Sequence, residues 1–223
     1  MTSSRPNTHL ETELFRPHMI LCAGEDPIEF IDAFTSVSHI QPKLMLEYRC
    51  YRFWHAGDLL LAWSGIGTGC IEPFMHEYFQ LGDPARVALL GTAGLVDGSG
   101  LSLGQGYCIS NAYNRQNAIN ALGTSPEHSY SPQTDTLLLE SASIVSTDLY
   151  YGLDSSLSLE NAQLVDMETA QFYWLCSKQT KAFEYLSFKG PANRLGFPED
   201  QDRWTPEVLR ACSSAAIEWT LRP

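Results

Sequence analysis

Short apolar runs that each lead into a glycine-containing segment are the feature that most constrains the fold of this chain. Residues 18–23 form one such run and lead into Gly24, and residues 86–90 form another and lead into residues 91–94, Gly-Thr-Ala-Gly. Runs of this length that are apolar after their first residue are typical of strands buried on both faces of a sheet. We therefore expect a central sheet whose strands end at glycine turns, where a backbone can approach a ligand closely.

Helical patterns alternate with these runs. Asp26 and Pro27 open a predicted helix over residues 26–38, because Asp is a favoured N-cap and Pro is favoured at the first helical position. Alternation of strands and helices indicates the α/β class, here a three-layer α/β/α arrangement around a central mixed sheet. Further helices are predicted over residues 71–81, 167–178 and 206–219, a hairpin over residues 48–54 and 58–63, and strands over residues 106–111, 141–146 and 183–189.

The length of 223 residues suits one compact domain. Residues 1–17 are expected to form a loose, polar N-terminal extension, and residues 18–223 a single domain. Residues 112–135 are rich in Asn, Ser, Pro and Thr and are expected to form a long excursion. Such excursions often serve as lids or interfaces.

The charge and the hydrophobic content exclude several classes of protein. Hydrophobic residues make up 44% of the chain, which is enough for a large core. The formal charge of −12 repels phosphate backbones, so we expect no nucleic-acid partner, although single nucleosides remain compatible with it. The N-terminus lacks the apolar core of a signal peptide, and no apolar run could span a bilayer. We therefore expect a soluble, cytoplasmic protein without membrane contact.

Cysteines and histidines give no sign of a metal site. The chain has six of each, with no CxxC and no histidine pair at metal-ligand spacing. We expect no metal and no cofactor, and we expect the cysteines to be reduced thiols, as is usual in the cytoplasm. A Ser/His/Asp hydrolase is disfavoured because no GxSxG is present.

Two glycine-containing segments and one acidic segment each admit two interpretations. Residues 64–67 (Ser-Gly-Ile-Gly) and 91–94 suit tight strand connections, but together they could also form a cradle of N–H groups for a phosphate, a water or a ribose hydroxyl. Neither matches a P-loop or a GxGxxG. Residues 165–170 (Val-Asp-Met-Glu-Thr-Ala) open a helix, where carboxylates are stabilised by the helix dipole. Alternatively, Glu168 turns toward a pocket and accepts hydrogen bonds from a diol.

Taken in chain order, these segments resemble the nucleoside phosphorylase/nucleosidase superfamily. They are most similar to the methylthioadenosine/S-adenosylhomocysteine nucleosidases and the futalosine hydrolases, and the resemblance covers about residues 18–220. Its most specific part is residues 165–170, which look like the family's V-E-M-E-x-A segment. The other parts are the first strand ending at Gly24, the segments 64–67 and 91–94, a Ser-x-Asp ending at Asp148, and the last strand ending near residues 189–193.

The resemblance implies roles for particular residues. Glu168 would hold the 2′- and 3′-hydroxyls of a ribose, with Met167 packing under the sugar. Thr92 and the amides of residues 91–94 would face the nucleophile, which Ser64 would help to order. The remaining substrate-binding positions implied are Gly24, Ala93, Gly94, Asp148 and Tyr150, whose ring would stack on the base.

The last strand departs from the family pattern. Nucleosidases carry R-x-x-S-D there, and its Asp protonates the purine. Aligning residues 189–193 with this pattern places Lys189 on the Arg and Asn193 on the Asp. An amide cannot supply a proton, and loss of a general acid typically lowers a rate by about 10²–10⁴-fold. An amide can still hydrogen-bond N7 or O6 of a purine, so Asn193 favours a 6-oxopurine over adenine.

Two further departures concern the nucleophile. Family phosphorylases often hold phosphate with an Arg just before the second glycine segment, where this chain has Leu89 and Leu90. This favours water over phosphate as the nucleophile, although Arg16, Arg49, Arg52 or Arg86 could bring a cation to the site, and Arg49 lies where some family members use a cation from a neighbouring subunit. For the residue that activates water after the first strand, Glu25 is the first candidate and Glu29 the second.

Three functions stay open from the sequence. The first is a purine nucleosidase, the second is a purine nucleoside phosphorylase that uses inorganic phosphate, and the third is a degenerate member that binds nucleosides without turnover. The substitution of Asn193 for an acid motivates the third. Because subunits of this family often complete each other's pockets, we expect a homo-oligomer.

Overall fold

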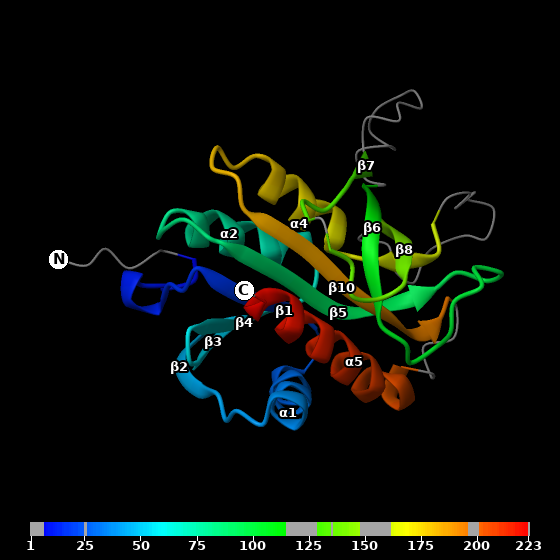
Figure 1. Cartoon of the computed structure of the whole chain (residues 1–223), viewed down its shortest axis with the longest axis horizontal. Coiled ribbons are helices and arrows are strands. Elements are labelled where there is room, and N and C mark those ends of the chain that lie inside the picture. Colours follow the sequence, from blue (N-terminus) through cyan, green and yellow to red (C-terminus); the bar gives the residue numbers. More distant parts are fainter. Residues whose placement is uncertain are drawn as a thin grey trace.

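The computed structural model describes residues 7–24, 26–114, 129–134, 136–147, 162–195 and 201–222, the side chains of residues 201 and 202 excepted. This part of the chain forms a mixed sheet with helices on both faces, which confirms the predicted class (Figure 1). The strands are β1 (His18–Ala23), β2 (Lys43–Tyr48), β3 (Tyr51–Ala56), β4 (Leu59–Ser64), β5 (Arg86–Leu95), β6 (Tyr107–Asn114), β7 (Ser129–Tyr130), β8 (Ser141–Ser146), β9 (Leu164–Asp166) and β10 (Glu184–Arg194). The helices are η1 (Thr12–Leu14, a 3₁₀ turn), α1 (Pro27–Ser38), α2 (Thr68–Phe79), α4 (Thr169–Ser177) and α5 (Gln201–Leu221).

One half of the sheet closes on itself. The strand order is β10-β6-β8-β9-β5-β1-β4-β3-β2, with β7 beside β6, and β5 pairs with β10 as well. The five strands β5, β10, β6, β8 and β9 therefore form a closed ring, while β1, β4, β3 and β2 extend outward from β5. Bulges in β10, between Pro191 and Asn193, and in β6, between Ile109 and Asn111, accompany this curvature.

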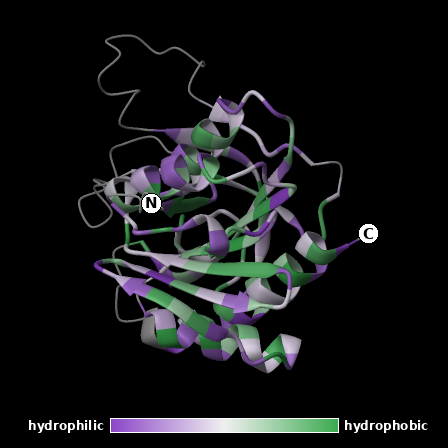
Figure 2. Cartoon of the chain, turned by 90° about the vertical axis from the view of Figure 1, so that its left-hand side faces the viewer, coloured by the Kyte–Doolittle hydropathy of each residue, from purple (hydrophilic) through white to green (hydrophobic). Residues whose placement is uncertain are grey.

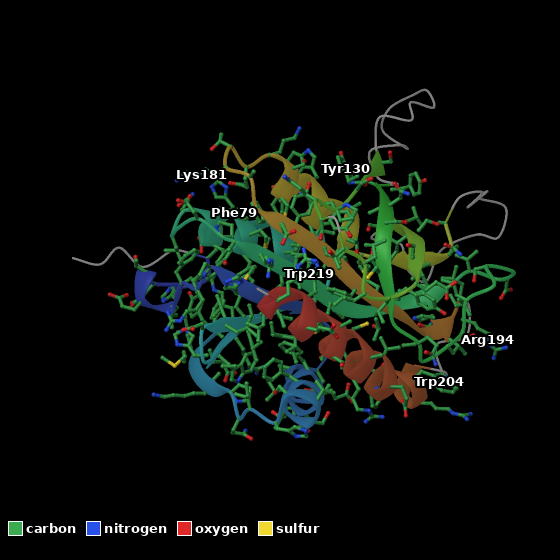
Figure 3. The ribbon with its side chains drawn as sticks, viewed as in Figure 1. Phe79, Tyr130, Lys181, Arg194, Trp204 and Trp219 are labelled. Atoms are coloured by element: carbon green, nitrogen blue, oxygen red, sulfur yellow. The ribbon has the colours of Figure 1, made fainter. Side chains whose placement is uncertain are left out.

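Alternating residues of the inner strands supply two hydrophobic cores, one on each face. Along β5, Val87 and Leu89 belong to the core beneath α2 and α4, whereas Ala88 and Leu90 belong to the core beneath α1 and α5. In Figure 2 hydrophobic residues run along the central strands, between the helices. Trp219 of α5 is fully buried and packs edge-on against Phe188 of β10 (Figure 3). Burial on both faces explains why the central stretches of these strands are largely apolar.

Several predicted elements are confirmed, whereas one predicted turn and the predicted end of the last strand are wrong. The strands over residues 18–23 and 141–146 have the predicted bounds. The cap of α1 is also confirmed, because Asp26 Oδ1 accepts the Ile28 N–H at 2.7 Å. Residues 91–94 do not form a turn but continue β5, and residues 189–193 continue β10, because the two strands pair with each other along this whole stretch. The short strands β2 and β9 were not predicted.

The N-terminal residues 7–14 are packed on the domain and are not loose. Leu10 is fully buried and Leu14 nearly so. Glu77 of α2 accepts hydrogen bonds from the backbone and side chain of Asn7, at 3.0 and 2.7 Å, and of Thr8, at 2.9 and 2.7 Å. Burial works to raise the pKa of Glu77, but these hydrogen bonds outweigh it and hold the pKa below its ordinary value.

We expect Glu77→Ala to lower the free energy of unfolding by about 1.5–3 kcal/mol, since it removes hydrogen bonds to a buried charged group. Because the pKa of Glu77 is depressed in the folded state, its contribution is present above the unfolded pKa and is lost as pH falls through the folded pKa. Urea unfolding of both proteins at several pH values measures this. Glu72→Ala, at an exposed position of the same helix, is the control. An equal loss for both variants, or a loss for Glu77→Ala that persists in acid, would contradict the interpretation.

Two other predictions can be compared with the described residues. All six cysteines are free thiols, as predicted. None of the helices in the described ranges is long and apolar enough to cross a membrane.

Candidate active site

A short stretch of β5 is paired along one edge only. On that edge β5 follows β10 from Arg86 to Leu95. On the other edge β1 accompanies it as far as Leu90, and β9 accompanies it from Gly94. Among the described residues, 91–93 therefore lie in a gap between the ends of β1 and β9. Ends of strands that separate in this way are where α/β sheets bind ligands.

Glu168 lies beside this gap, two residues after the end of β9 and at the N-cap position of α4. Its side chain is buried, with only 3% of the residue exposed. Oε1 accepts the backbone N–H of Gly67 at 2.7 Å, and Oε2 accepts a hydrogen bond from Lys189 Nζ at 3.2 Å. The Lys189 nitrogen in turn lies against the backbone of Gly91, where an added Cβ would come within 2.9 Å of it. Segments 64–67, 91–94 and 165–170 thus meet at this carboxylate.

Asp166 completes a buried ion triad. Lys189 Nζ lies 3.2 Å from Asp166 Oδ2 and is fully buried. The other contacts of Asp166 are with Ser146 Oγ and with the N–H and hydroxyl of Thr169, at 2.5, 3.0 and 2.5 Å. The hydrogen-bonding capacity of Asp166 is thus largely used within the protein, whereas Glu168 accepts only one hydrogen bond on each oxygen from the described residues. A carboxylate has about four lone-pair sites, so Glu168 can still accept hydrogen bonds from a ligand.

The triad carries one more negative than positive charge. Burial alone would lower the pKa of Lys189, but Asp166 and Glu168 raise it above the ordinary value, so the lysine stays protonated. Burial raises the pKa of Glu168; Lys189 opposes this, and Asp166 adds to it. The ionised form of Glu168 is therefore only partly compensated within the protein, and hydroxyl donors from a ligand would stabilise it.

A small hollow lies on the other side of the same strand ends. It is lined by Cys22, Gly24, Asp26, Glu29, Thr92, Thr205 and Leu209. The structure therefore places Thr92, Gly24 and Glu29 along one hollow. Glu29 is exposed, in the first turn of α1, whereas Glu25 lies outside the described residues.

Ser64 and Met167 lie on either side of the Gly65–Gly67 turn. Ser64 ends β4 and is fully buried, and its Oγ has no hydrogen-bond partner among the described residues. Buried polar groups rarely stay without a partner, so this hydroxyl is suited to bind a ligand or an ordered water. Met167 is half-buried, and its methyl group would lie 3.7 Å from a Cβ added at Gly67.

Asn193 lies farther along β10, opposite Gly94 of β5 in the register. It is buried, and its Nδ2 donates to the Arg194 carbonyl at 3.0 Å. Ala93 and Gly94 are buried strand residues between Thr92 and β9. Asp148 and Tyr150 lie outside the described residues.

Sequence reasoning underestimated Lys189 and Asp166. The sequence explains Asp166 only as a carboxylate at the start of a helix. In the structure it accepts the Thr169 N–H at that helix end and also pairs with Lys189. The signal that points to the burial of Lys189 is its place in a strand pattern with Tyr185, Leu186 and Phe188, in a strand that continues beyond it. The described residues contain no cluster of three or more His, Cys, Asp or Glu that could hold a metal ion.

Comparisons with known proteins identify the fold. No protein-family model matches the chain, and no curated protein matches its sequence. Solved structures do match over nearly the whole chain. The 5′-methylthioadenosine nucleosidase of Arabidopsis thaliana superposes with a TM-score of 0.73 at 14% identity, covering 93% of this chain and 98% of that one. The chain has the nucleoside phosphorylase/nucleosidase fold.

Phosphorylases share this fold equally well. Uridine phosphorylase of Vibrio fischeri gives a TM-score of 0.74 at 16% identity, covering 98% of this chain and 97% of that one. Purine nucleoside phosphorylase of Toxoplasma gondii gives 0.69 at 16% identity, covering 98% of both chains. The nucleoside phosphorylase fold predicted from the sequence is thus confirmed, and the choice of reaction depends on the residues of the site.

Proposed function

We propose that this protein cleaves the N-ribosyl bond of a nucleoside. The observation that carries the proposal is the buried carboxylate of Glu168, which the backbone of Gly67 and the cation of Lys189 hold at the gap beside β5. A fixed, desolvated carboxylate is suited to accept hydrogen bonds from two neighbouring hydroxyls, as in the 2′,3′-diol of a ribose. The proteins that share the fold are named as nucleosidases and nucleoside phosphorylases, which agrees with this ligand class.

The chemistry of the bond assigns parts to the rest of the site. Cleavage passes through a sugar with oxocarbenium character, while negative charge develops on the leaving base. Negative charge near the sugar stabilises this state, and a donor near the base assists departure. Glu168 supplies the first, and the buried amide of Asn193 is our candidate for the second. A nucleophile would approach from the side of Thr92 and Gly24.

We propose water as the nucleophile, because three of the four arginines that could bring phosphate are held elsewhere. Arg86 pairs with Glu184 at 2.6 Å, and Arg52 pairs with Glu47 at 2.7 Å. Arg16 donates to the carbonyls of residues 13 and 15. Of the two glutamates predicted to activate water, Glu29 lies within the described residues and lines the same hollow as Thr92, so it is our candidate for this role.

Arg49 keeps phosphorolysis as the second candidate. It is exposed in the turn between β2 and β3, has a φ of 53°, and its guanidinium lies 5.1 Å from the centre of the Tyr48 ring. Arg49 directly precedes Cys50, and the Cys50 carbonyl accepts the N–H of Gly65. The arginine is therefore only one residue from a contact with the Gly65–Gly67 turn of the candidate site. Release of ribose 1-phosphate would identify this reaction.

The base is proposed to be a 6-oxopurine, because Asn193 offers both an N–H donor and a carbonyl acceptor but no acidic proton. We expect Asn193→Asp to raise turnover of a 6-aminopurine nucleoside by roughly ten-fold or more, since it restores a group that can protonate N7. Turnover of inosine should fall in the same variant. Steady-state rates on both substrates measure this, and Asn193→Ala, which should lose activity on both, is the control. Parallel changes on the two substrates in Asn193→Asp would contradict the assignment.

The proposed function is tested by a nucleoside panel assayed with and without phosphate, with free base measured by chromatography. Hydrolysis predicts base release without phosphate, and phosphorolysis predicts release only with phosphate. Thermal stabilisation by a nucleoside without release of base would identify the third candidate, a binding protein that has lost turnover. Neither stabilisation nor release across inosine, guanosine, futalosine and methylthioadenosine would refute all three.

Two further expectations remain as proposals. We propose that the protein is a homo-oligomer and that it resides in the cytoplasm. Light scattering on the purified protein measures the first, and a mass equal to one chain would contradict it.

A further inference from the structure

Two cysteines lie in contact beside the candidate site. Cys50 ends the turn between β2 and β3, and Cys70 lies in the first turn of α2. A Cβ added at Gly65 would come within 2.9 Å of Cys70 Sγ and 3.2 Å of Cys50 Cβ, so both side chains pack on the same glycine. Their approach to the same point of the turn places the two side chains next to each other. Both residues are half-buried, whereas the other four cysteines are fully buried or nearly so.

The backbones of this pair hold the turn that binds Glu168. The Cys50 carbonyl accepts the Gly65 N–H at 2.9 Å, and the Cys70 N–H donates to the Gly67 carbonyl at 3.1 Å. Gly67 then donates its own N–H to Glu168. The pair is therefore linked to the Glu168 carboxylate through the Gly65–Gly67 turn, so a change in the distance between the two cysteines would reach the carboxylate.

We propose that Cys50 and Cys70 are a site of reversible oxidation, and that their disulfide impairs the site around Glu168. The oxidant is a peroxide. One cysteine loses its proton, its thiolate attacks a peroxide oxygen and the O–O bond breaks, so that a sulfenic acid forms and the departing hydroxide takes up that proton as water. The second thiol then attacks the sulfenic sulfur, the S–O bond breaks, and its oxygen leaves as water with the thiol proton. The two sulfurs are oxidised and hydrogen peroxide is reduced to two molecules of water.

The disulfide should displace the turn because it is shorter than a thiol contact. Forming an S–S bond draws the two side chains closer than a non-bonded contact allows, and so pulls on the hairpin turn and α2. Both side chains pack against Gly65, so we expect this residue to be displaced with them. We expect the Gly67–Glu168 hydrogen bond to weaken, and turnover to fall by about ten- to hundred-fold, as for loss of a hydrogen bond to a charged group.

The reaction should be selective and pH-dependent. Burial raises the pKa of Cys70 to about 11, and Cys50 adds to this. Because the thiolate is the reactive form, oxidation should speed up as pH rises from neutral. Burial also raises the pKa of Cys108 and of Cys176, and both side chains are buried more completely than those of Cys50 and Cys70. These buried cysteines serve as internal controls.

The disulfide itself is tested without reference to function. The full chain is treated with hydrogen peroxide, free thiols are alkylated, and the digest is mapped by mass spectrometry. We expect a peptide linked through Cys50 and Cys70, its loss in Cys50→Ser and in Cys70→Ser, and its disappearance after dithiothreitol. Hydrogen–deuterium exchange should show faster exchange of the peptide containing Gly65–Gly67 in the oxidised protein. Absence of the linked peptide, or unchanged exchange at this turn, would overturn the proposal.

The effect on turnover rests on the proposed function and is measured separately. Peroxide should lower the rate of base release in the native chain but not in Cys50→Ser, and dithiothreitol should restore it. Equal rates for the linked and reduced proteins would overturn the regulatory part. If the reduced protein released no base from any nucleoside, the proposed function would fail, while peptide mapping and exchange would still decide the oxidation site.

Discussion

We expect Glu168→Gln to lower turnover of a ribonucleoside by on the order of a hundred-fold or more while leaving the protein folded. The carboxylate is proposed to accept hydrogen bonds from two sugar hydroxyls, and each hydrogen bond to a charged group contributes about 1.5–3 kcal/mol. Glutamine keeps the size of the side chain but removes the charge that stabilises the developing positive sugar. Steady-state kinetics at saturating and limiting substrate measure the loss.

Stability separates this effect from unfolding. The triad has two carboxylates for one lysine, so Glu168→Gln removes the surplus buried charge and leaves Lys189 paired with Asp166. We therefore expect the melting temperature to stay within a few degrees of the native value. A 2′-deoxynucleoside is the matched control, because it lacks one of the two hydroxyls and should lose less rate on mutation. An equal loss with both substrates would argue against the contact between Glu168 and the diol.

Lys189→Met, unlike Glu168→Gln, should destabilise the folded protein. We expect it to lower the free energy of unfolding by about 3–5 kcal/mol. The lysine is fully buried between Asp166 and Glu168, at 3.2 Å from each. Its removal leaves two buried carboxylates without a cation, so at least one of them must take up a proton. For a chain of this size the melting temperature should fall by roughly 10 °C, and the loss should shrink as pH falls, because protonation relieves the repulsion.

Lys181→Met is the matched control. Lys181 pairs with Asp83 at 2.5 Å, but its side chain is 70% exposed at the rim of the molecule (Figure 3). A solvated pair of this kind contributes about 0–1 kcal/mol. Similar losses for the two variants, measured by urea unfolding, would show that the triad is not the buried electrostatic element described here.

Much of the fold could be predicted from the sequence because its strands are buried on both faces. The bounds of the strands over residues 18–23 and 141–146 follow from the local sequence pattern, and Asp26 and Pro27 mark the start of α1. The ends of β5 and β10 could not be predicted, because Gly91 and Gly190 are local signals for a turn. In the structure these glycines instead permit close approach, of Lys189 to one and of the residue 105 carbonyl to the other. Close approach depends on a strand from elsewhere in the chain.

Part of the candidate site lies in segments that the sequence itself singles out. Glu168, Thr92 and Ser64 belong to segments with recognisable spacing, and the structure places these segments around the gap beside β5. The partners of Glu168 were not predictable from spacing, because the Gly67 N–H lies 101 positions away and Lys189 reaches it from another strand. The closure of β5, β10, β6, β8 and β9 into a ring is likewise a product of long-range pairing.

A crystal structure of the protein with a bound ribonucleoside, or with a non-cleavable analogue, tests the central claim most directly. The account predicts that both sugar hydroxyls donate to the Glu168 carboxylate while Gly67 and Lys189 keep their contacts with it. A sugar bound away from this carboxylate, or a Glu168 that contacts only protein atoms in the complex, would contradict it.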